Sequence, residues 1–248
     1  MDTLSLPPTQ QSLPKSFLLH ILPGALVTIC FVLLKPLLDS TGFPPLLAFL
    51  VVILFIDIPV LLGIMFFEGR KQNGKFSLLG VVLYREKTPW GKFALIFIGA
   101  FAAVYALITL IAPFNAFLSA NLFSWLPKWM FLEEQSQYLA YAKNILVITF
   151  VIQLIVTGIF LPWVEELYFR GYLLPRISRY KWWAPVFSGL CFGLYHSWQL
   201  YGFLTVFLLG TALGYLVMWR QDIRLSIGLH VCANIFARLA FLLAALSM

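Results

Sequence analysis

The chain has 248 residues, of which 61% are hydrophobic and 11% charged, with a formal net charge of +7 and a mean hydropathy of +0.91. This composition excludes a water-soluble globular domain, because apolar runs of roughly 20 residues recur throughout and each can cross about 30 Å of hydrocarbon. The alternating pattern of a transmembrane β-barrel is absent. The basic residues lie in short loops between apolar runs, so no nucleic-acid partner is expected. The chain is predicted to be an all-α polytopic integral membrane protein.

About seven transmembrane helices are predicted, within a range of six to eight. In chain order, the predicted spans cover residues 16–38, 44–67, 93–113, 144–162, 182–198, 202–219 and 226–246. The first span is too long for a secretory signal and lacks a small-residue cleavage site, so it is read as a retained helix. The compact chain without a long soluble extension favours a prokaryotic plasma membrane.

Basic residues predict the orientation of these spans. They cluster after the second, fourth and sixth spans, and one topology places all three clusters on the same side. Under the positive-inside rule that side is cytoplasmic, and the amino terminus lies there too. The acidic pair Glu133 and Glu134 lies in the segment 114–141 on the opposite side. Apolar residues recur in this segment at nearly helical spacing, which predicts an amphipathic interfacial helix; they are Phe117, Leu118, Leu122, Trp125 and Trp129.

Several polar or reactive residues are assigned structural roles. The cysteines Cys30, Cys191 and Cys232 are odd in number and lie in apolar stretches without C-x-x-C spacing, so they are read as packing residues. His20 has no visible partner and is read as structural or interfacial. Asp57, near Pro59 in the second span, could line a cavity or pair with a basic residue, and it is left outside the predicted site.

Two adjacent carboxylates, Glu165 and Glu166, begin the part of the chain that carries the chemistry. Ionisable residues at membrane depth are functional-site candidates, since hydrocarbon penalises each by at least ~2.5–3.5 kcal/mol. On an α-helix, positions i and i+4 share a face, so Glu166 can pair with Arg170 while Glu165 points elsewhere. A paired Glu166 is structural, whereas a partly desolvated Glu165 beside a like charge is the candidate general base.

Two further pairs follow at i, i+4 spacing, Phe192 with His196 and His230 with Asn234. An imidazole and a carboxamide that converge on one point can stabilise an oxyanion, and an imidazole with a carboxylate can deprotonate a water. These are the parts of a hydrolase that uses activated water. No G-x-S-x-G motif indicates a serine nucleophile, and neither Cys191 nor Cys232 has a demonstrated base partner.

The three motifs, Glu165-Glu166-x-x-x-Arg170, Phe192-x-x-x-His196 and His230-x-x-x-Asn234, together resemble the signature of the CAAX prenyl protease and bacteriocin-processing family. This is the family of intramembrane endopeptidases that includes the type II CAAX prenyl endopeptidase. The glycine-bearing run 207–214 is also similar to that family. The resemblance implies that Glu165 and His196 activate the hydrolytic water and that His230 and Asn234 bind the oxyanion. It assigns a supporting role to Glu166 and Arg170.

A metal remains an alternative. Glu165, His196 and His230 could hold a zinc ion with water in the fourth position. Two observations favour catalysis without a metal or other cofactor. The sequence has no H-E-x-x-H motif, and the histidine that faces Asn234 fits the role of an oxyanion donor.

The chain is expected to form a single membrane domain, in which residues 1–143 are amino-terminal helices plus the interfacial segment and residues 144–248 are the catalytic helical core. The predicted function is hydrolysis of a peptide bond in a membrane-associated peptide or protein, with or without a prenyl group. Membrane lipids and this substrate are the expected partners. A noncatalytic scaffold or bacteriocin-immunity protein of the same fold is an alternative, and a transporter is another, although no paired halves with matching interrupted spans are visible. The site is expected in a polar intramembrane cavity that opens toward the cytoplasmic side.

Overall fold

The structure is a computed structural model that describes residues 9–248. Within these residues, six helices are long and apolar enough to cross a membrane and a seventh apolar helix is shorter. The described part of the chain forms isolated β-bridges but no strand. The prediction of an all-α polytopic membrane protein with about seven helices is therefore confirmed.

Several of the long helices consist of shorter segments joined end to end. In chain order, the first long helix is α1 (Leu13–Leu38). The second joins α2 (Pro45–Val52), η2 (Ile53–Asp57) and α3 (Ile58–Asn73). The third is α4 (Trp90–Asn121), which is followed by the short turns η3 (Lys128–Met130) and η4 (Gln135–Tyr138). The fourth joins α5 (Lys143–Ile155), η5 (Val156–Phe160), α6 (Leu161–Glu165), η6 (Glu166–Leu173) and η7 (Leu174–Tyr180). The remaining elements are α7 (Trp183–Tyr195), η8 (Ser197–Gly202), α8 (Phe203–Arg220) and α9 (Ile223–Ser247).

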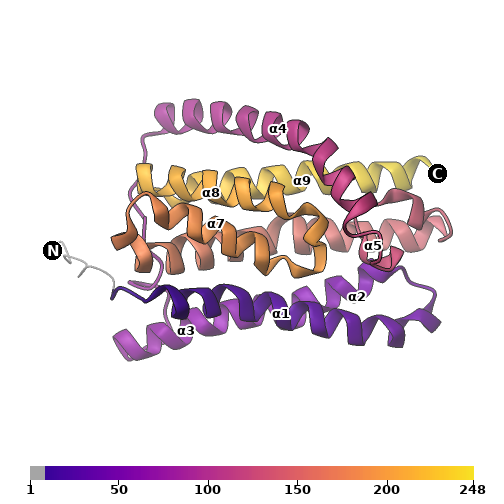
Figure 1. The fold of residues 1–248 in the computed structure, drawn as a ribbon, viewed down its shortest axis with the longest axis horizontal. Helices are drawn as coiled ribbons and strands as arrows, with labels where there is room; N and C mark the ends of the chain where they lie inside the picture. The colour runs from indigo at the N-terminus through magenta and orange to yellow at the C-terminus, as the bar shows by residue number, and fades with distance from the viewer. Residues whose placement is uncertain (1–8) are drawn as a thin grey trace.

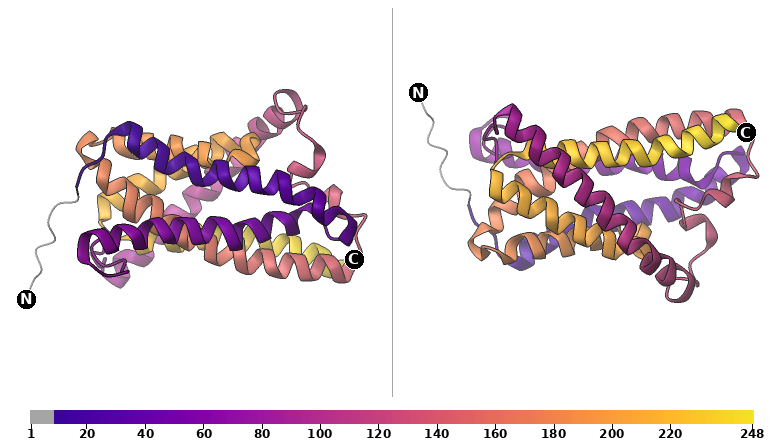
Figure 2. Two further views of the ribbon diagram at one scale, coloured as in Figure 1. Left: turned by 90° about the horizontal axis from the view of Figure 1, so that it is seen from below. Right: turned by 90° about the horizontal axis from the view of Figure 1, so that it is seen from above.

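The helices form a bundle with the carboxy-terminal half in the middle. Figure 1 shows α7, α8, α9 and α5 between α4 on one side and α1 to α3 on the other. The right-hand view of Figure 2 shows α4 crossing over α8 and α9 at an angle. No residue of α4 is buried, and Leu95 and Leu110 are each 75% exposed. Such a continuous apolar surface is typical of a helix in contact with lipid.

The basic segments meet at one end of the bundle. The Arg176 guanidinium donates to the carbonyl of Val81 (3.0 Å), and the Glu86 amide donates to the carbonyl of Gln221 (2.9 Å). The amide of Gln11 donates to the carbonyl of Arg176 (2.7 Å), which brings the start of the described chain to the same end. The structure thus gathers the three clusters that the charge pattern assigned to one side.

Prolines do not end these helices where the sequence suggested. The span predicted to finish at Pro162 continues to Tyr180. Proline lacks an N–H donor and clashes with the carbonyl four residues earlier. The chain accommodates this with widened π-helical turns that end two residues before Pro59, Pro162 and Pro175. Each wide turn replaces a hydrogen bond that the proline could not make, so the helix persists.

The predicted amphipathic helix over 114–141 is wrong. α4 runs through Pro113 to Asn121, and the rest of the segment is irregular apart from the turns η3 and η4. Of its aromatic side chains, Trp129 packs on the bundle in edge contact with Phe31 (5.3 Å between ring centroids), whereas Phe117 and Trp125 are exposed. The near-helical spacing therefore reflects a folded-back loop with buried anchors, among them Leu132 and Tyr138.

Candidate active site

Glu165 lies deep in the bundle, because its helix continues well beyond it. It precedes the helix end at Tyr180 by about 22 Å, at ~1.5 Å per residue. The short helix α7 stops at Tyr195, and His196 leaves the helical conformation with φ −74° and ψ 44°. The predicted spans 144–162 and 182–198 would place Glu165 near the cytoplasmic boundary and His196 deep in the membrane, whereas these helix ends bring the two side chains to the same depth.

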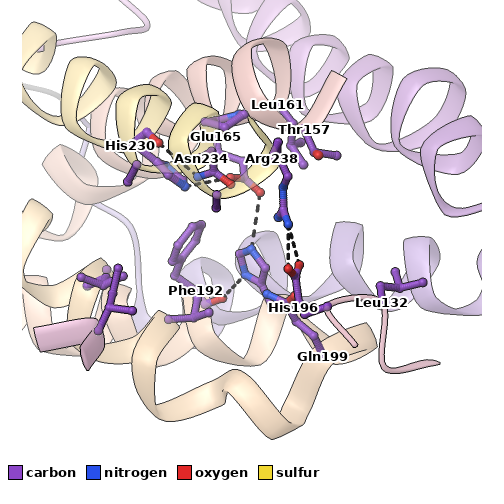
Figure 3. A pocket seen from close by; sticks show the side chains of 18 of the residues that line it. Leu132, Thr157, Leu161, Glu165, Phe192, His196, Gln199, His230, Asn234 and Arg238 are labelled. Atoms are coloured by element: carbon purple, nitrogen blue, oxygen red, sulfur yellow. Dashed lines mark hydrogen bonds and ion pairs between the residues drawn. The ribbon is translucent and has the colours of Figure 1, made fainter. Parts of the chain in front are cut away.

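The three motifs converge on Glu165, which is 2% exposed. Its Oε1 lies 3.7 Å from Nε2 of His196, and its Oε2 lies 3.8 Å from Nε2 of His230. Figure 3 shows these side chains, with Asn234, pointing into one pocket. A carboxylate with a different imidazole facing each oxygen is the central feature of the site.

Both histidines are oriented by their other ring nitrogen. Nδ1 of His196 lies 2.9 Å from the carbonyl oxygen of Phe192, which can only accept, so Nδ1 carries the proton. In a neutral ring, Nε2 of His196 then presents a lone pair to the pocket. Nδ1 of His230 donates to Oε1 of Glu166 at 2.9 Å. Both Nε2 atoms are therefore directed at Glu165.

Glu166 and Arg170 lie behind the pocket and form the predicted pair. Nη1 of Arg170 is 3.0 Å from Oε1 of Glu166, and both side chains are almost fully buried. Arg170 also donates from Nη2 to the carbonyl of Gly210 (3.2 Å) and lies over the ring of Phe192 (4.1 Å to the centroid). The pair thus connects α8, the Phe192 ring and His230, which makes it the support of the site.

A glycine makes this contact with α8 possible. A Cβ atom added at Gly210 would lie 3.0 Å from a ring carbon of Phe192 and 3.1 Å from Nη2 of Arg170. These distances are tighter than ordinary packing allows, so a side chain here would displace the guanidinium. This is the physical reason for a glycine in the run 207–214.

Asn234 follows His230 by one turn of α9 and lines the same pocket. Its amide nitrogen donates to the carbonyl of His230 at 3.1 Å. A carboxamide nitrogen carries two hydrogens, so one N–H remains for a ligand. The four predicted catalytic residues therefore share one cavity with Phe192.

The cavity holds about 220 Å³ of space for water-sized molecules and runs between α4, α5, α8 and α9. Leu132 and Glu133, from the segment between α4 and α5, also line it. That segment lies on the side opposite to the basic clusters in the predicted topology. The lining therefore extends away from the basic end, in contrast to the predicted opening toward it.

Two residues beside the site were not identified from the sequence. The Tyr195 hydroxyl donates a short hydrogen bond to Oδ2 of Asp57, and both groups are close enough to Glu165 to act on its charge. Asp57 is fully buried, and its Oδ1 has no hydrogen-bond partner. A buried carboxyl in the second span was the signal, but nothing in the sequence indicated that Tyr195 would reach it.

The remaining polar candidates lie outside the site. His20 is fully buried and bonds to the carbonyl of Ser16 (2.7 Å) and the hydroxyl of Ser188 (3.2 Å), as a packing histidine would. Cys191 is buried, whereas Cys30 and Cys232 are partly buried, and all three are free thiols.

The candidate zinc ligands are Glu165, His196 and His230. Across residues 9–248, no three His, Cys, Asp or Glu side chains form a cluster that could hold a metal ion. Glu165 offers one oxygen to each histidine rather than sharing one point with both. Two ligands that each lie ~2.0–2.2 Å from a zinc ion are at most about 4.4 Å apart, so a zinc ion bound here would contact both oxygens of Glu165 at the separations of 3.7 and 3.8 Å.

The central segment of the chain matches a known family. Residues 147–236 match the family model described as type II CAAX prenyl endopeptidase Rce1-like. Over this segment, the chain is similar to the Rce1-like family. The match includes every residue of the three motifs and confirms the resemblance seen in the sequence. At family level this match supports a membrane protease of the CAAX type. No curated protein and no solved structure matches it significantly.

Proposed function

We propose that this Rce1-like chain is an intramembrane endopeptidase that hydrolyses a peptide bond of a membrane-associated substrate through a water activated by Glu165 and His196. The observation that supports the proposal is the position of Glu165, whose two carboxylate oxygens face the Nε2 atoms of His196 and His230 inside one cavity. Hydrocarbon penalises such groups, and a purely structural role would not need two imidazoles directed at one carboxylate.

The distances suit a bridging water. Separations of 3.7 and 3.8 Å exceed those of direct hydrogen bonds, and a gap of this kind calls for a water between the groups. Glu165 takes one proton from this water while Nε2 of His196 accepts the second hydrogen bond and fixes its direction. The resulting hydroxide attacks the peptide carbonyl, and protonated Glu165 then gives the proton to the leaving amine.

The oxyanion is stabilised from the α9 side. His230 donates from Nε2 when both ring nitrogens carry protons, and its Nδ1 then keeps the hydrogen bond to the Glu166 carboxylate. Asn234 adds its free amide N–H one turn further along the helix. Removing one such donor typically costs ~10²–10³ in kcat.

Residues 144–248 form the catalytic core in this proposal, and no metal is required. The basic end faces the cytoplasm of a prokaryotic cell; the first eight residues lie outside the described part of the chain. Glu165, His196 and His230 would be the ligands if zinc were bound, and the ion would polarise the carbonyl and activate the water.

The test is cleavage of a farnesylated CAAX-type peptide by the purified protein in detergent. Glu165→Gln should lower the rate by at least ~10³, because the general base is lost, while the thermal unfolding midpoint should change little. Glu134→Gln is the matched control, since Glu134 is exposed and its carboxylate accepts a hydrogen bond from Ser136, outside the cavity. An active Glu165→Gln variant would overturn the proposal.

Two additional arms separate the alternatives. A strong zinc chelator should leave the wild-type rate unchanged, and loss of activity that returns on adding zinc would replace the proposed chemistry with a metal mechanism. An unprenylated peptide of the same sequence tests whether the lipid is recognised. A wild-type protein that cleaves neither peptide would favour the noncatalytic scaffold.

A further inference from the structure

A carboxyl group from the second span lies behind the site. Asp57 ends the widened turn η2, two residues before Pro59, and is fully buried. It belongs to none of the three motifs, and it does not line the cavity. Across residues 9–248, no ion pair includes it. Hydrocarbon penalises such a carboxyl, which marks it as a candidate for a functional role.

Tyr195 is the hydrogen-bond partner of Asp57, and its ring is fixed in place. The hydroxyl donates to Oδ2 of Asp57, whereas Oδ1 has no partner among the described residues. The tyrosine is fully buried, and its ring meets those of Phe169 and Trp198 edge-on, at 4.9 and 5.2 Å between centroids. The ring therefore cannot swing away, and only the direction of its O–H bond is free to change.

The same hydroxyl lies within reach of a second carboxyl group, that of Glu165. It is close enough to Glu165 for a hydrogen bond. A phenol has one proton to donate, so it serves only one of the two carboxyl groups at a time. In the structure Asp57 receives that proton, and Oε1 of Glu165 has no hydrogen-bond partner. The direction of one O–H bond thus decides whether Glu165 is free.

This direction matters because Glu165 is the proposed general base. A hydrogen bond donated to a carboxylate stabilises its charged form. A carboxylate that accepts such a bond from a fixed phenol takes a proton from water less readily, and it has one lone pair fewer to hold that water. The proposed base is therefore most effective when Tyr195 donates to another acceptor, and Asp57 is that acceptor.

We propose that Asp57 is a positioning residue of the hydrolytic site, which accepts the only hydroxyl proton of Tyr195 and so leaves the Glu165 carboxylate free to bind and deprotonate water. Asp57 acts through Tyr195 and contacts neither the water nor the substrate, since it lies outside the cavity. This inference rests on the proposed function, because Glu165 is the general base only in that mechanism.

The first test removes the acceptor and measures kcat and KM separately with the farnesylated peptide. Asp57→Leu keeps a side chain of similar size, and Tyr195 should then turn its hydroxyl to Glu165. We expect kcat to fall roughly tenfold or more, the effect of one hydrogen bond to a charged group. KM should stay unchanged, because Asp57 does not line the cavity. Asp57→Asn retains an acceptor oxygen and should keep most of the rate.

A second substitution distinguishes a misdirected proton from damaged packing. Adding Tyr195→Phe to Asp57→Leu removes the donor and should restore kcat. Adding Tyr168→Phe is the matched control and should restore nothing, since the hydroxyl of Tyr168, also a buried residue, donates to the carbonyl of Leu19 instead (2.8 Å). If Asp57 only packs the helices, Asp57→Leu with Tyr195→Phe should be no faster than Asp57→Leu. That result would overturn the inference, as would a wild-type kcat in Asp57→Leu.

Tyr195→Phe alone decides the question if Asp57→Leu does not fold. This variant removes the hydroxyl that competes for Glu165, so it should retain most of the wild-type kcat. A tenfold loss of kcat in a folded Tyr195→Phe protein would show that the hydroxyl itself is needed, and it would overturn the role proposed for Asp57.

Infrared spectra of the purified protein keep this inference separate from the proposed function, because they need no turnover. The carboxylate band of Glu165, identified by its loss in Glu165→Gln, should shift in Asp57→Leu and return when Tyr195→Phe is added. These shifts in a protein that cleaves no peptide would refute the catalytic proposal, while the control of the Tyr195 proton by Asp57 stands. Cleavage by a protein whose band and kcat ignore Asp57→Leu would refute the inference, while the protease activity stands.

Discussion

Replacing Arg170 by methionine tests the support of the site directly. The substitution keeps most of the side-chain volume but leaves Glu166 as a buried carboxylate without the guanidinium that lies 3.0 Å away. At an effective dielectric constant of about 20, two unit charges ~3 Å apart attract by about 5 kcal/mol. Breaking one side of a buried pair costs ~3–5 kcal/mol in measured cases. We therefore expect Arg170→Met to destabilise the protein by about that amount.

Thermal unfolding in detergent, followed by tryptophan fluorescence, measures this effect. For a chain of this size, 1 kcal/mol shifts the midpoint by ~2–4 °C, so the expected fall is roughly 6–20 °C. The double variant Glu166→Gln with Arg170→Met removes both charges and should recover at least half of the lost stability. A single variant that loses less than ~1 kcal/mol, well below the cost of breaking a buried pair, would refute the reasoning. So would a double variant no more stable than the single one.

Two further predictions concern packing and pH. A Cβ atom at Gly24 would lie 1.9 Å from the carbonyl oxygen of Tyr195, so Gly24→Ala should lower the unfolding midpoint and also the cleavage rate, whereas Gly63→Ala, at an open position, should do neither. Burial alone raises the pKa of Asp222, but hydrogen bonds from Arg224 and the Thr88 amide outweigh it and lower the pKa from 3.8 to about 2. The lowered pKa of Asp222 contributes about 1–2 kcal/mol to the stability of the folded protein. This contribution is complete above the unfolded pKa and is lost as the pH falls toward 2. Asp222→Asn should remove it in acid titrations of stability, and an unchanged acid midpoint would contradict the assignment.

The division between the two glutamates followed from helix geometry alone. Four residues separate Glu166 from Arg170, and the two form an ion pair, although the segment between them is a widened π turn. Glu165 faces His196 and His230 instead of Arg170. Local periodicity survives small changes in helix winding, because a pair at i, i+4 stays on one side of the helix in both forms.

Helix ends were predicted less well. Pro162 was read as a terminus, yet a wide turn over Val156–Phe160 absorbs it and the helix continues. Whether a proline ends a helix or is accommodated depends on what packs around the freed carbonyl groups, and that is decided by neighbouring helices. The sequence therefore predicted how many helices there are, but not how deep Glu165 lies.

Contacts between distant segments could not be predicted at all. Asp57 meets the Tyr195 hydroxyl, and Glu133 meets Arg238, across more than 100 positions of sequence in each case. Each residue was visible as a charge in or near an apolar run, which marks a candidate. Its partner depends on how the helices pack, and one sequence contains no direct record of that.

The proposed division into an amino-terminal half and a catalytic half has to accommodate these contacts. The motifs all lie beyond residue 143, within the segment that matches the family model. Yet α1 approaches the end of α7 closely enough to require a glycine at position 24, and the second span delivers Asp57 to the residue next to His196. The first half therefore forms part of the wall that holds His196 in place. Because the proposed catalytic groups depend on that wall for their orientation, the two halves are expected to fold and function as one unit.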